Sequence, residues 1–581
     1  MFMRVGKTAM LLGIAAASTG CVLGTSGMAQ AVTASSAGHS SAGVDSHQVV
    51  NSFLRSQPAS IGASAADGYQ LVRTTTSPDG TSHFRYERTY RSLPVVGGDF
   101  VIHVKNGKVV GQSGSQHRAI ALPTTPKVAA ATSRTHAISG AGNYNVSGAT
   151  KPELVVDVTG AAPVLAWRTI VTGIQSDGSP SQRSVLVNAS NGKVIRASEN
   201  VATLVAAKDS RAASVRAGHR APSLTPAGAK HAASVPTIAK PGQRPLHTAK
   251  AAAAETATGK TTFYGDVDLN VTAGGAGNQL IDPDRGDGST CNSNHTGSTY
   301  SGTGDTCTQV DSSGTTFGDG TSSDPNTEAA DAQFAVAQTW DYYKDTFNRT
   351  GIFDDGKGVA SHVHFGEQGW LNAAWNGEGM VYGDGGSKGS MVALDVAGHE
   401  MTHGVSESNA KLGYSGDVGG INESTSDVFG TMVEFQANNS YDKPDFLIGE
   451  TIDMNGDGSP LRWMDDPSKD GSSISCWSSS TADEDPHYTS GVGNHAFFLM
   501  SNGSGTSDWG DSPTCDNSTV TGIGADKAAN IWYNAIKDYG TSDMSYADLK
   551  AGMVKSADSL YGANSTESQA VSAAWSAVDV S

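Results

Sequence analysis

The residues best suited to chemistry lie in the segment D-V-A-G-H-E-M-T-H-G-V, from Asp395 to Val405. His399 and His403 are four residues apart, and on a helix this spacing places both imidazole rings on one face, within reach of one metal ion. Glu423 follows twenty residues after the second histidine and can add a carboxylate ligand. Two histidines, one carboxylate and an open fourth position are typical of a catalytic zinc site, in which Glu400 would be the base.

A helix that merely buries two histidines is the alternative interpretation. It does not account for Glu423, nor for Asp427, which lies one helical turn further on and can orient a histidine ring. The metzincin pattern would need a third histidine where this chain has Asn409, and it is therefore excluded. The spacing favours a zinc hydrolase that cleaves peptide bonds.

The start of the chain has the pattern of a secretory signal. Residues 1–31 combine a basic start at Arg4 and Lys7, a short apolar core and a small-x-small cleavage site, Ala29-Gln30-Ala31. No other apolar run reaches the roughly 18 residues that a transmembrane helix needs. We expect a secreted, extracellular protein that does not bind membranes and acts as a monomer.

Four cysteines remain after the signal, and an even number in an exported chain indicates disulfide bonds. Three pairings can be drawn, of which proximity favours Cys291–Cys307 and Cys476–Cys515. A structural zinc site built from all four thiolates is the alternative, although the C-x2-C spacings that it needs are absent.

Charge is distributed unevenly along the chain. The formal net charge is −18, with +15 in residues 1–254 and −33 in residues 255–581. Such asymmetry can indicate nucleic-acid binding, but the basic half has no aromatic-studded basic surface and belongs to an exported chain. We expect no nucleic-acid partner. Instead, the basic half should lie against the acidic half, whose carboxylates also suit calcium.

Composition divides the 581 residues into several domains. Between about 50 and 200, two alternating apolar runs turn at Asn106-Gly107 and Asn191-Gly192, which predicts two small α+β modules. Residues 201–254 are rich in Ala, Pro, Lys and Arg, and predict a flexible linker in which a precursor would be cleaved.

The second half begins with short strands and continues with helices. Helices are predicted over 331–348, 394–408, 525–539 and 546–560, and another begins near Asn422. This pattern predicts a β-rich lobe (255–405) and a helical lobe (406–581), with the metal helix at their junction. Clefts at such junctions commonly bind substrates.

Several longer motifs carry a family resemblance. Arg85 to Phe100 (R-Y-E-R-T-Y-R-S-L-P-V-V-G-G-D-F) resembles a propeptide segment of the thermolysin family of secreted zinc metalloendopeptidases. Four further motifs follow in that family's order: N-A-A-W-N-G-E-G-M-V-Y-G-D-G, Y-S-G-D-V-G-G-I-N-E, L-R-W-M-D-D-P and H-Y-T-S-G-V-G-N-H-A. The resemblance implies an α+β fold, namely a two-lobed zincin preceded by a two-module α+β propeptide over residues 32–200.

The resemblance also implies a role for each matching residue in catalysis. One zinc ion would be bound by His399, His403 and Glu423. Glu400 would act as general base on a zinc-activated water, and Asp427 would fix the tautomer of His399. Tyr414 and His487 would donate hydrogen bonds to the oxyanion. Asp485 is favoured as the carboxylate that orients His487, with Asp483 as the alternative.

Substrate and calcium sites follow from the same resemblance. The substrate backbone would be bound by Asn372, by the carbonyl of Ala373 and by Arg462. A pocket for a bulky apolar residue at P1′, the first residue after the scissile bond, would be lined by Val396, Ile448, Ile452 and Leu461. One or more calcium ions would be bound by Asp395, Glu434, Asp445 and Glu450. Leu447 replaces a glutamate that family members with a second calcium ion carry there.

These patterns favour an endopeptidase that is made as an inhibited precursor, with its own propeptide as folding aid and inhibitor. A non-catalytic binding protein would not need Glu400 together with all three ligands. A zinc exopeptidase would need a group that captures a chain terminus, and the sequence shows no signature of one. Cleavage of internal bonds in peptides blocked at both ends would separate the three.

Overall fold

The computed structural model describes residues 45–581 except 117, 143–144, 207–254, 276, 296–306 and 455. The predicted signal sequence and most of the predicted linker lie outside the described residues. Residues 45–581 form one compact unit. Over the described ranges, no helix combines the length and the apolar character needed to cross a bilayer.

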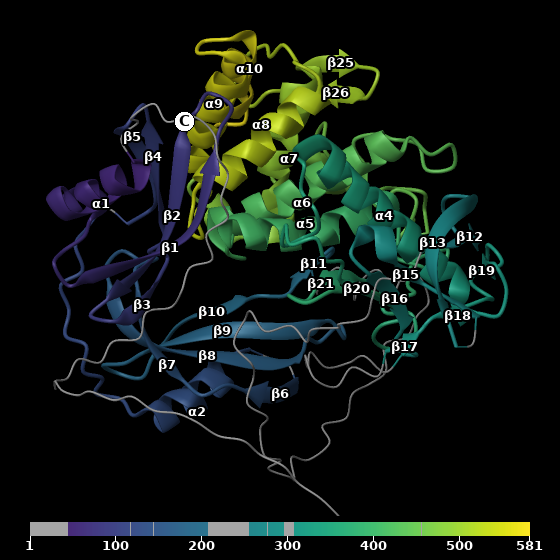
Figure 1. The fold of residues 1–581 in the computed structure, drawn as a ribbon, viewed down its shortest axis with the longest axis horizontal. Helices are drawn as coiled ribbons and strands as arrows, with labels where there is room; N and C mark the ends of the chain where they lie inside the picture. Colours follow the sequence, from purple (N-terminus) through teal and green to yellow (C-terminus); the bar gives the residue numbers. More distant parts are fainter. Residues whose placement is uncertain are drawn as a thin grey trace, which may run out of the picture. The chain divides into compact units, whose positions relative to one another are not determined.

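The pro-region contains the two predicted α+β modules (Figure 1). The first comprises α1 (Ser46–Ser56), β1 (Asp67–Thr76), β2 (Ser82–Tyr90), β3 (Leu93–Val96), β4 (Phe100–Lys105) and β5 (Lys108–Ser113). Its core packs Val50 of α1 against Phe84 and Ile102 of the sheet. Asn106 and Gly107 turn the chain between β4 and β5 with φ of 50° and 70°, as the Asn-Gly signal predicts.

The second module continues the sheet of the first. It comprises α2 (Ala130–Gly140), β6 (Asn145–Ala149), β7 (Glu153–Asp157), β8 (Val164–Ile174), β9 (Pro180–Asn188) and β10 (Val194–Glu199). Strands β3 and β7 pair in parallel, so both modules share one ten-stranded sheet. The shared sheet is not visible in the local patterns, because the pairing joins segments about 60 residues apart.

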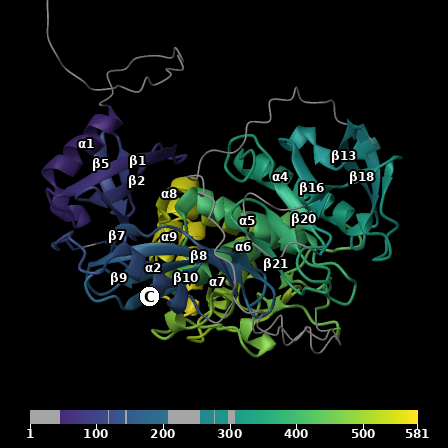
Figure 2. The same cartoon turned by 90° about the horizontal axis from the view of Figure 1, so that it is seen from below.

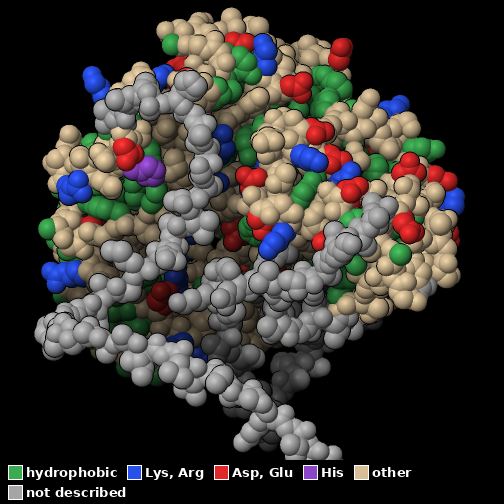
Figure 3. All heavy atoms as spheres, viewed as in Figure 1, with side chains coloured by type: hydrophobic (Ala, Val, Ile, Leu, Met, Phe, Trp, Pro, Cys, Tyr) green, Lys and Arg blue, Asp and Glu red, His purple; other side chains and the backbone are tan. Residues whose placement is uncertain are grey.

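The β-rich lobe contains two sheets and one long helix. The five-stranded sheet is formed by β12 (Glu255–Lys260), β13 (Asp266–Gly274), β14 (Gly277–Gln279), β18 (Asp311–Ser312) and β19 (Thr316–Phe317). The seven-stranded sheet is formed by β11 (Ala202–Thr203), β15 (Ile281–Asp282), β16 (Gly288–Asn292), β17 (Thr308–Gln309), β20 (Ala360–Val363), β21 (Ala373–Trp375) and β22 (Met380–Tyr382). Helix α4 (Asn326–Phe347) packs on both sheets. Acidic side chains gather over the part of this lobe at the right of Figure 3.

The helical lobe is built around two buried helices, α5 (Leu394–Ala410) and α6 (Gly416–Ala437). Around them lie α7 (Pro486–Asn502), α8 (Ala525–Tyr539), α9 (Tyr546–Tyr561), α10 (Thr566–Ala577) and the hairpin of β23 (Leu447–Ile448) and β24 (Arg462–Trp463). Helices α5 and α6 approach closely at Gly398 and Gly430, since a Cβ on Gly430 would lie 2.3 Å from the carbonyl oxygen of Asp395. This approach brings the ligands on the two helices together.

Several boundaries differ from the prediction, and helix α4, for example, begins at Asn326 rather than at Asp331. Helix α6 begins at Gly416 rather than near Asn422, because its glycines weaken local helix propensity but allow close contacts. A Cβ on Gly420, for example, would lie 2.5 Å from Thr489 Oγ1 and from the hydroxyl of Tyr546. The predicted lobe boundary at residues 405–406 falls inside α5, which continues to Ala410 to complete its contacts with α6.

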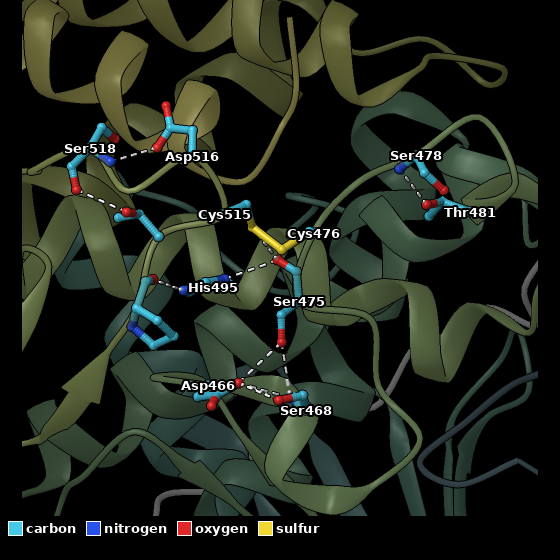
Figure 4. The surroundings of a disulfide bond; sticks show 12 residues. Asp466, Ser468, Ser475, Cys476, Ser478, Thr481, His495, Cys515, Asp516 and Ser518 are labelled. Atoms are coloured by element: carbon cyan, nitrogen blue, oxygen red, sulfur yellow. Dashed lines mark hydrogen bonds between the residues drawn. A yellow bond between two sulfur atoms is a disulfide. The ribbon is translucent and has the colours of Figure 1, made fainter.

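Both disulfide bonds that proximity favours are present. Cys291 pairs with Cys307, and Cys476 pairs with Cys515. Beside the second bond, the two ring nitrogens of His495 lie 2.9 and 2.8 Å from the carbonyl oxygens of Ser475 and Pro513 (Figure 4). All four sulfur atoms are therefore committed, which excludes a four-thiolate zinc site.

Candidate active site

His399, His403 and Glu423 converge in the buried space between α5 and α6. The two histidine Nε2 atoms lie 2.9 Å apart, and each lies 3.5 Å from an oxygen of Glu423. All three side chains are at most 2% exposed. Their ligating atoms form one of the groups in the described chain that could hold a metal ion.

The outer contacts of this group direct its lone pairs inward. His399 Nδ1 lies 2.8 Å from Asp427 Oδ1, and His403 Nδ1 lies 3.0 Å from both Asn422 Oδ1 and Ser426 Oγ. Imidazoles that donate from Nδ1 carry a lone pair on Nε2, so two lone pairs and a carboxylate face one another. In the described part of the chain, Glu423 Oε2 accepts no hydrogen bond. This arrangement fits a bound cation. Without a cation, the two lone pairs and the carboxylate would repel one another.

Asp427 connects the metal group to Arg462. The guanidinium Nε and Nη2 lie 2.8 and 2.6 Å from the two Asp427 oxygens, and Asn494 Nδ2 lies 2.8 Å from Oδ2. Burial alone would raise the pKa of Asp427, but Arg462 and His399 hold it well below its usual value. Asp427 is therefore an anion that can accept the His399 proton.

Glu400 lies on α5 between the two histidines and is fully buried. Neither carboxylate oxygen has a hydrogen-bond partner among the described residues. Burial raises the pKa of Glu400 well above its usual value, and the charge of Glu423 adds to the effect. A buried carboxylate without hydrogen-bond partners lowers the stability of the fold. Catalytic groups commonly carry such a cost.

Tyr414 and His487 face the same carbonyl oxygen. His487 Nε2 lies 2.7 Å and the Tyr414 hydroxyl 3.4 Å from the oxygen of Thr203. Asp485 Oδ1 lies 2.6 Å from His487 Nδ1, so the structure places the favoured carboxylate against the ring. Burial lowers the pKa of His487, but Glu423 and Asp485 together raise it to about 9, which makes the ring a donor toward the Thr203 oxygen.

A segment of the chain itself contacts the candidate active site. Residues 201–206 are buried, and β11 pairs antiparallel with β21. The predicted linker therefore begins too early at residue 201. The reason is that V-A-T-L-V-A is an apolar run at the edge of the Ala/Pro/Lys-rich region, and it can pair as a strand.

The three predicted backbone-binding residues all hold this segment. Leu204 N donates to the Ala373 carbonyl at 3.0 Å, and Arg462 Nη1 donates to the Leu204 carbonyl at 2.8 Å. Asn372 accepts from Val205 N at 3.1 Å and donates to the Val205 carbonyl at 3.0 Å. The segment is thus bound as an extended peptide would be.

The residues predicted to line the specificity pocket are apolar and mostly buried. Val396, Ile448 and Ile452 are at most 1% exposed, and the partly buried Leu461 packs against the same cluster. The Leu204 side chain is fully buried within that cluster. Leu204 therefore belongs to the same hydrophobic cluster as the predicted pocket residues.

The predicted calcium ligands form a second carboxylate group. Glu434, Asp445 and Glu450 place ligand atoms within 4.8 Å of one another. Asp395 stands apart, because its two oxygens accept from the amides of Val396 and Gly449. Asp442, which the sequence did not single out, is buried nearby, and burial raises its pKa to about 6.

Four polar residues that support the site were missed. They are Asn422, Ser426, Asp442 and Asn494. Asn422 and Ser426 flank Glu423 on α6, so helical spacing around a ligand could have indicated them. Asp442 and Asn494 offer no comparable local signal.

Three family models match the chain in order along the sequence. Residues 67–116 match the fungalysin/thermolysin propeptide motif, residues 256–407 the catalytic domain of thermolysin metallopeptidases, and residues 410–580 their α-helical domain. The fold and the site therefore define a metallopeptidase precursor.

Relatives give the same result. The chain is 30% identical over 544 residues to thermolysin from Alicyclobacillus acidocaldarius subsp. acidocaldarius, which covers 90% of this chain and 87% of that one. This chain belongs to the thermolysin family of metallopeptidases.

Two further relatives are covered only in part. Identity to the transglutaminase-activating metalloprotease of Streptomyces mobaraensis is 38% over 531 residues, which is 90% of this chain but 62% of that protein. Identity to bacillolysin from Bacillus cereus is 42% over 259 residues, 43% of this chain and 44% of the relative. The chain thus spans about three-fifths of the length of the first relative and less than half of the length of the second.

Proposed function

We propose that this protein is a secreted zinc endopeptidase that hydrolyses internal peptide bonds and is made as an inhibited precursor. One observation carries the proposal. The peptide bond between Thr203 and Leu204 lies in the candidate active site, with its carbonyl oxygen facing Tyr414 and His487 and the next residue held by Ala373. An enzyme that cuts within a chain must accommodate residues on both sides of the scissile bond, as this arrangement does for the residues around Thr203 and Leu204.

The donor set fits zinc, since two neutral imidazoles and one carboxylate converge without a proton between them. Held by His399, His403 and Glu423, zinc would supply Lewis acidity, which lowers the pKa of water and polarises a carbonyl.

The side chains of the protein perform the remaining tasks. Glu400 takes a proton from the attacking water and delivers it to the leaving amide nitrogen. Tyr414 and His487 donate to the oxygen that becomes negative. Arg462 keeps Asp427 ionised and holds the carbonyl on the leaving side.

The bond between Thr203 and Leu204 should be the first that the precursor cuts. The C–N bond breaks, water provides the hydroxyl of the new Thr203 carboxylate, and the Leu204 nitrogen takes the proton. N-terminal sequencing of incubated precursor should detect a new chain that begins at Leu204. Products that never begin at Leu204, even at early times, would contradict this assignment.

The pocket should prefer leucine or phenylalanine at P1′. Burying such a side chain contributes about 1.5–3 kcal/mol, so Leu204→Asp should slow the first cut roughly tenfold to a hundredfold. Leu204→Phe is the matched control and should be cut at nearly the rate of the wild type. Equal rates for the aspartate and phenylalanine variants would show that the cluster around Val396 and Ile448 does not select the substrate.

We also propose that Glu434, Asp442, Asp445 and Glu450 bind calcium, with Asp395 supporting them. Burial and mutual repulsion raise the pKa values of Glu434 and Glu450 well above their usual range. Within the described ranges, Glu434 Oε1 and Glu450 Oε2 have no hydrogen-bond partner. Clustered oxygen ligands of this kind are what calcium prefers.

Calcium removal at constant zinc should destabilise the fold. A cation present at a hundredfold excess over its Kd stabilises the native state by about 2.7 kcal/mol, so its loss should lower the unfolding temperature by several degrees and expose the chain to self-digestion. Calorimetry with and without calcium measures the effect. An unfolding temperature that ignores calcium would refute the site.

A further inference from the structure

A second group of metal-binding side chains lies in the β-rich lobe, away from both sites described above. Strands β16, β20 and β22 are parallel neighbours. His295, His364 and Asp384 each follow the carboxyl end of one of them. Glu328 joins them from the first turn of α4, which packs against β16 and β20 (Figure 2).

The distances among His295, His364 and Asp384 match those of a metal site, and Glu328 contacts His364. His295 Nε2 lies 3.5 Å from Asp384 Oδ2, and His364 Nδ1 lies 3.6 Å from the same oxygen and 3.3 Å from Glu328 Oε2. A tetrahedral ion with bonds of about 2.0–2.1 Å keeps its ligand atoms roughly 3.3 Å apart. The corresponding atoms of His399, His403 and Glu423 are separated by 2.9–3.5 Å. The two groups are therefore built on the same scale.

Contacts outside the group leave its lone pairs facing one another. His364 Nε2 lies 3.0 Å from the Pro325 carbonyl oxygen, so this nitrogen carries the proton of a neutral ring. Asp384 Oδ1 accepts from Gly369 N at 2.8 Å, which leaves Oδ2 to the group. In a neutral ring the Nδ1 lone pair of His364 then points at two carboxylates, an arrangement that either a metal ion between them or a proton on Nδ1 would stabilise. Such outer contacts commonly fix the ligands of a metal.

Glu328 is the second independent sign of a ligand. Its side chain is 3% exposed, and among the residues described neither oxygen accepts a hydrogen bond of good geometry. A buried carboxylate aimed into a group with two histidines requires a positive charge beside it.

We propose that His295, His364, Asp384 and Glu328 bind a second zinc ion, with a structural role. His295, His364 and Asp384 place one ligand atom each within 4.8 Å of one another, and Glu328 reaches the group beside His364. A carboxylate in the fourth position would leave no open site, which is the pattern of structural rather than catalytic zinc. Two imidazoles favour zinc over calcium, which takes oxygen ligands.

The position of this site suggests what it stabilises. His364 and Asp384 flank the segment that carries Asn372 and β21, the residues that hold the backbone of the bound peptide. An ion that joins both ends of this segment to α4 and to the loop after β16 would fix β21 in place. The four ligands span residues 295–384, so one ion would connect four separate elements of the lobe.

The competing interpretation is a protonated His364 that forms ion pairs with Glu328 and Asp384 and binds no metal. Zinc content per chain separates the two. The full precursor would carry Glu400→Gln to prevent self-cleavage, and zinc would be counted by elemental analysis and by native mass spectrometry. We expect two zinc ions per chain, one after His364→Asn, one after His403→Ala and none after both changes.

The variants are chosen to preserve the backbone. His364 and His295 have φ of 50° and 57°, a region that asparagine tolerates better than most residues. His295→Asn, at an exposed position, provides the test if His364→Asn does not fold. Glu367→Gln, an exposed carboxylate three residues after His364, is the control and should retain two ions. One zinc in the parent chain, or two in the folded His364→Asn and His295→Asn variants, would overturn the proposal.

Discussion

Replacing Glu400 by glutamine should abolish peptide hydrolysis and leave zinc bound. The side chain is not one of the converging ligands, and in the described chain its oxygens have no partners to lose. Glutamine retains the size but cannot accept the proton of water, and such proton transfer contributes about 10²–10⁴-fold to a rate. The measurement is kcat/KM on a blocked peptide together with zinc content. Activity above a few per cent of the wild-type value would refute the role of Glu400.

His403→Ala is the matched comparison for this variant. It removes a ligand, so zinc at the active site and hydrolysis should be lost together. Loss of hydrolysis with unchanged zinc in both variants would show that His403 does not hold the ion.

Expression of residues 255–581 without the pro-region should yield little active enzyme. Strand β1 of the pro-region and the residue after it, Ser77, cap polar groups of the catalytic region. Arg73 donates to Asn409 at 2.8 Å, while Thr75 and Ser77 donate to the buried Asp538 at 2.6 and 2.8 Å. Without these partners, buried polar groups must become solvated or remain unpaired during folding. Co-expression of residues 1–254 as a separate chain should restore activity, and full activity of 255–581 alone would contradict the proposed folding aid.

The same contacts refine the role of charge. Most of these contacts are hydrogen bonds between a neutral group and a charged one. The ion pair of Lys411 with Glu87 places a positive charge on the acidic catalytic region and a negative charge on the basic pro-region, which is the reverse of the overall charges. The +15 and −33 charges should therefore accelerate association at low salt more than they strengthen the bound state. Inhibition by the separate pro-region should develop more slowly as salt rises, which stopped-flow measurements can follow.

The features that the sequence predicts are the local ones. The i, i+4 spacing of His399 and His403 requires only a helix, and α8 spans 525–539 as predicted because its apolar face is continuous. Tertiary features were missed. The start of α6 depends on contacts that only glycines permit. Residues 202–203 form a strand within the buried segment 201–206 because β21 offers them a partner. The group around Glu328 has no sequence motif, because the fold assembles it from three strand ends and a helix.

The most direct test of the proposed function is hydrolysis by the processed enzyme of an internally quenched peptide that is blocked at both ends and carries leucine at P1′. The enzyme should cleave the bond before leucine, lose this activity when zinc is removed by a chelator, and regain it when zinc is restored with calcium held constant. Activity that persists in zinc-free enzyme, or cleavage only of peptides with a free terminus, would contradict the assignment as a zinc endopeptidase.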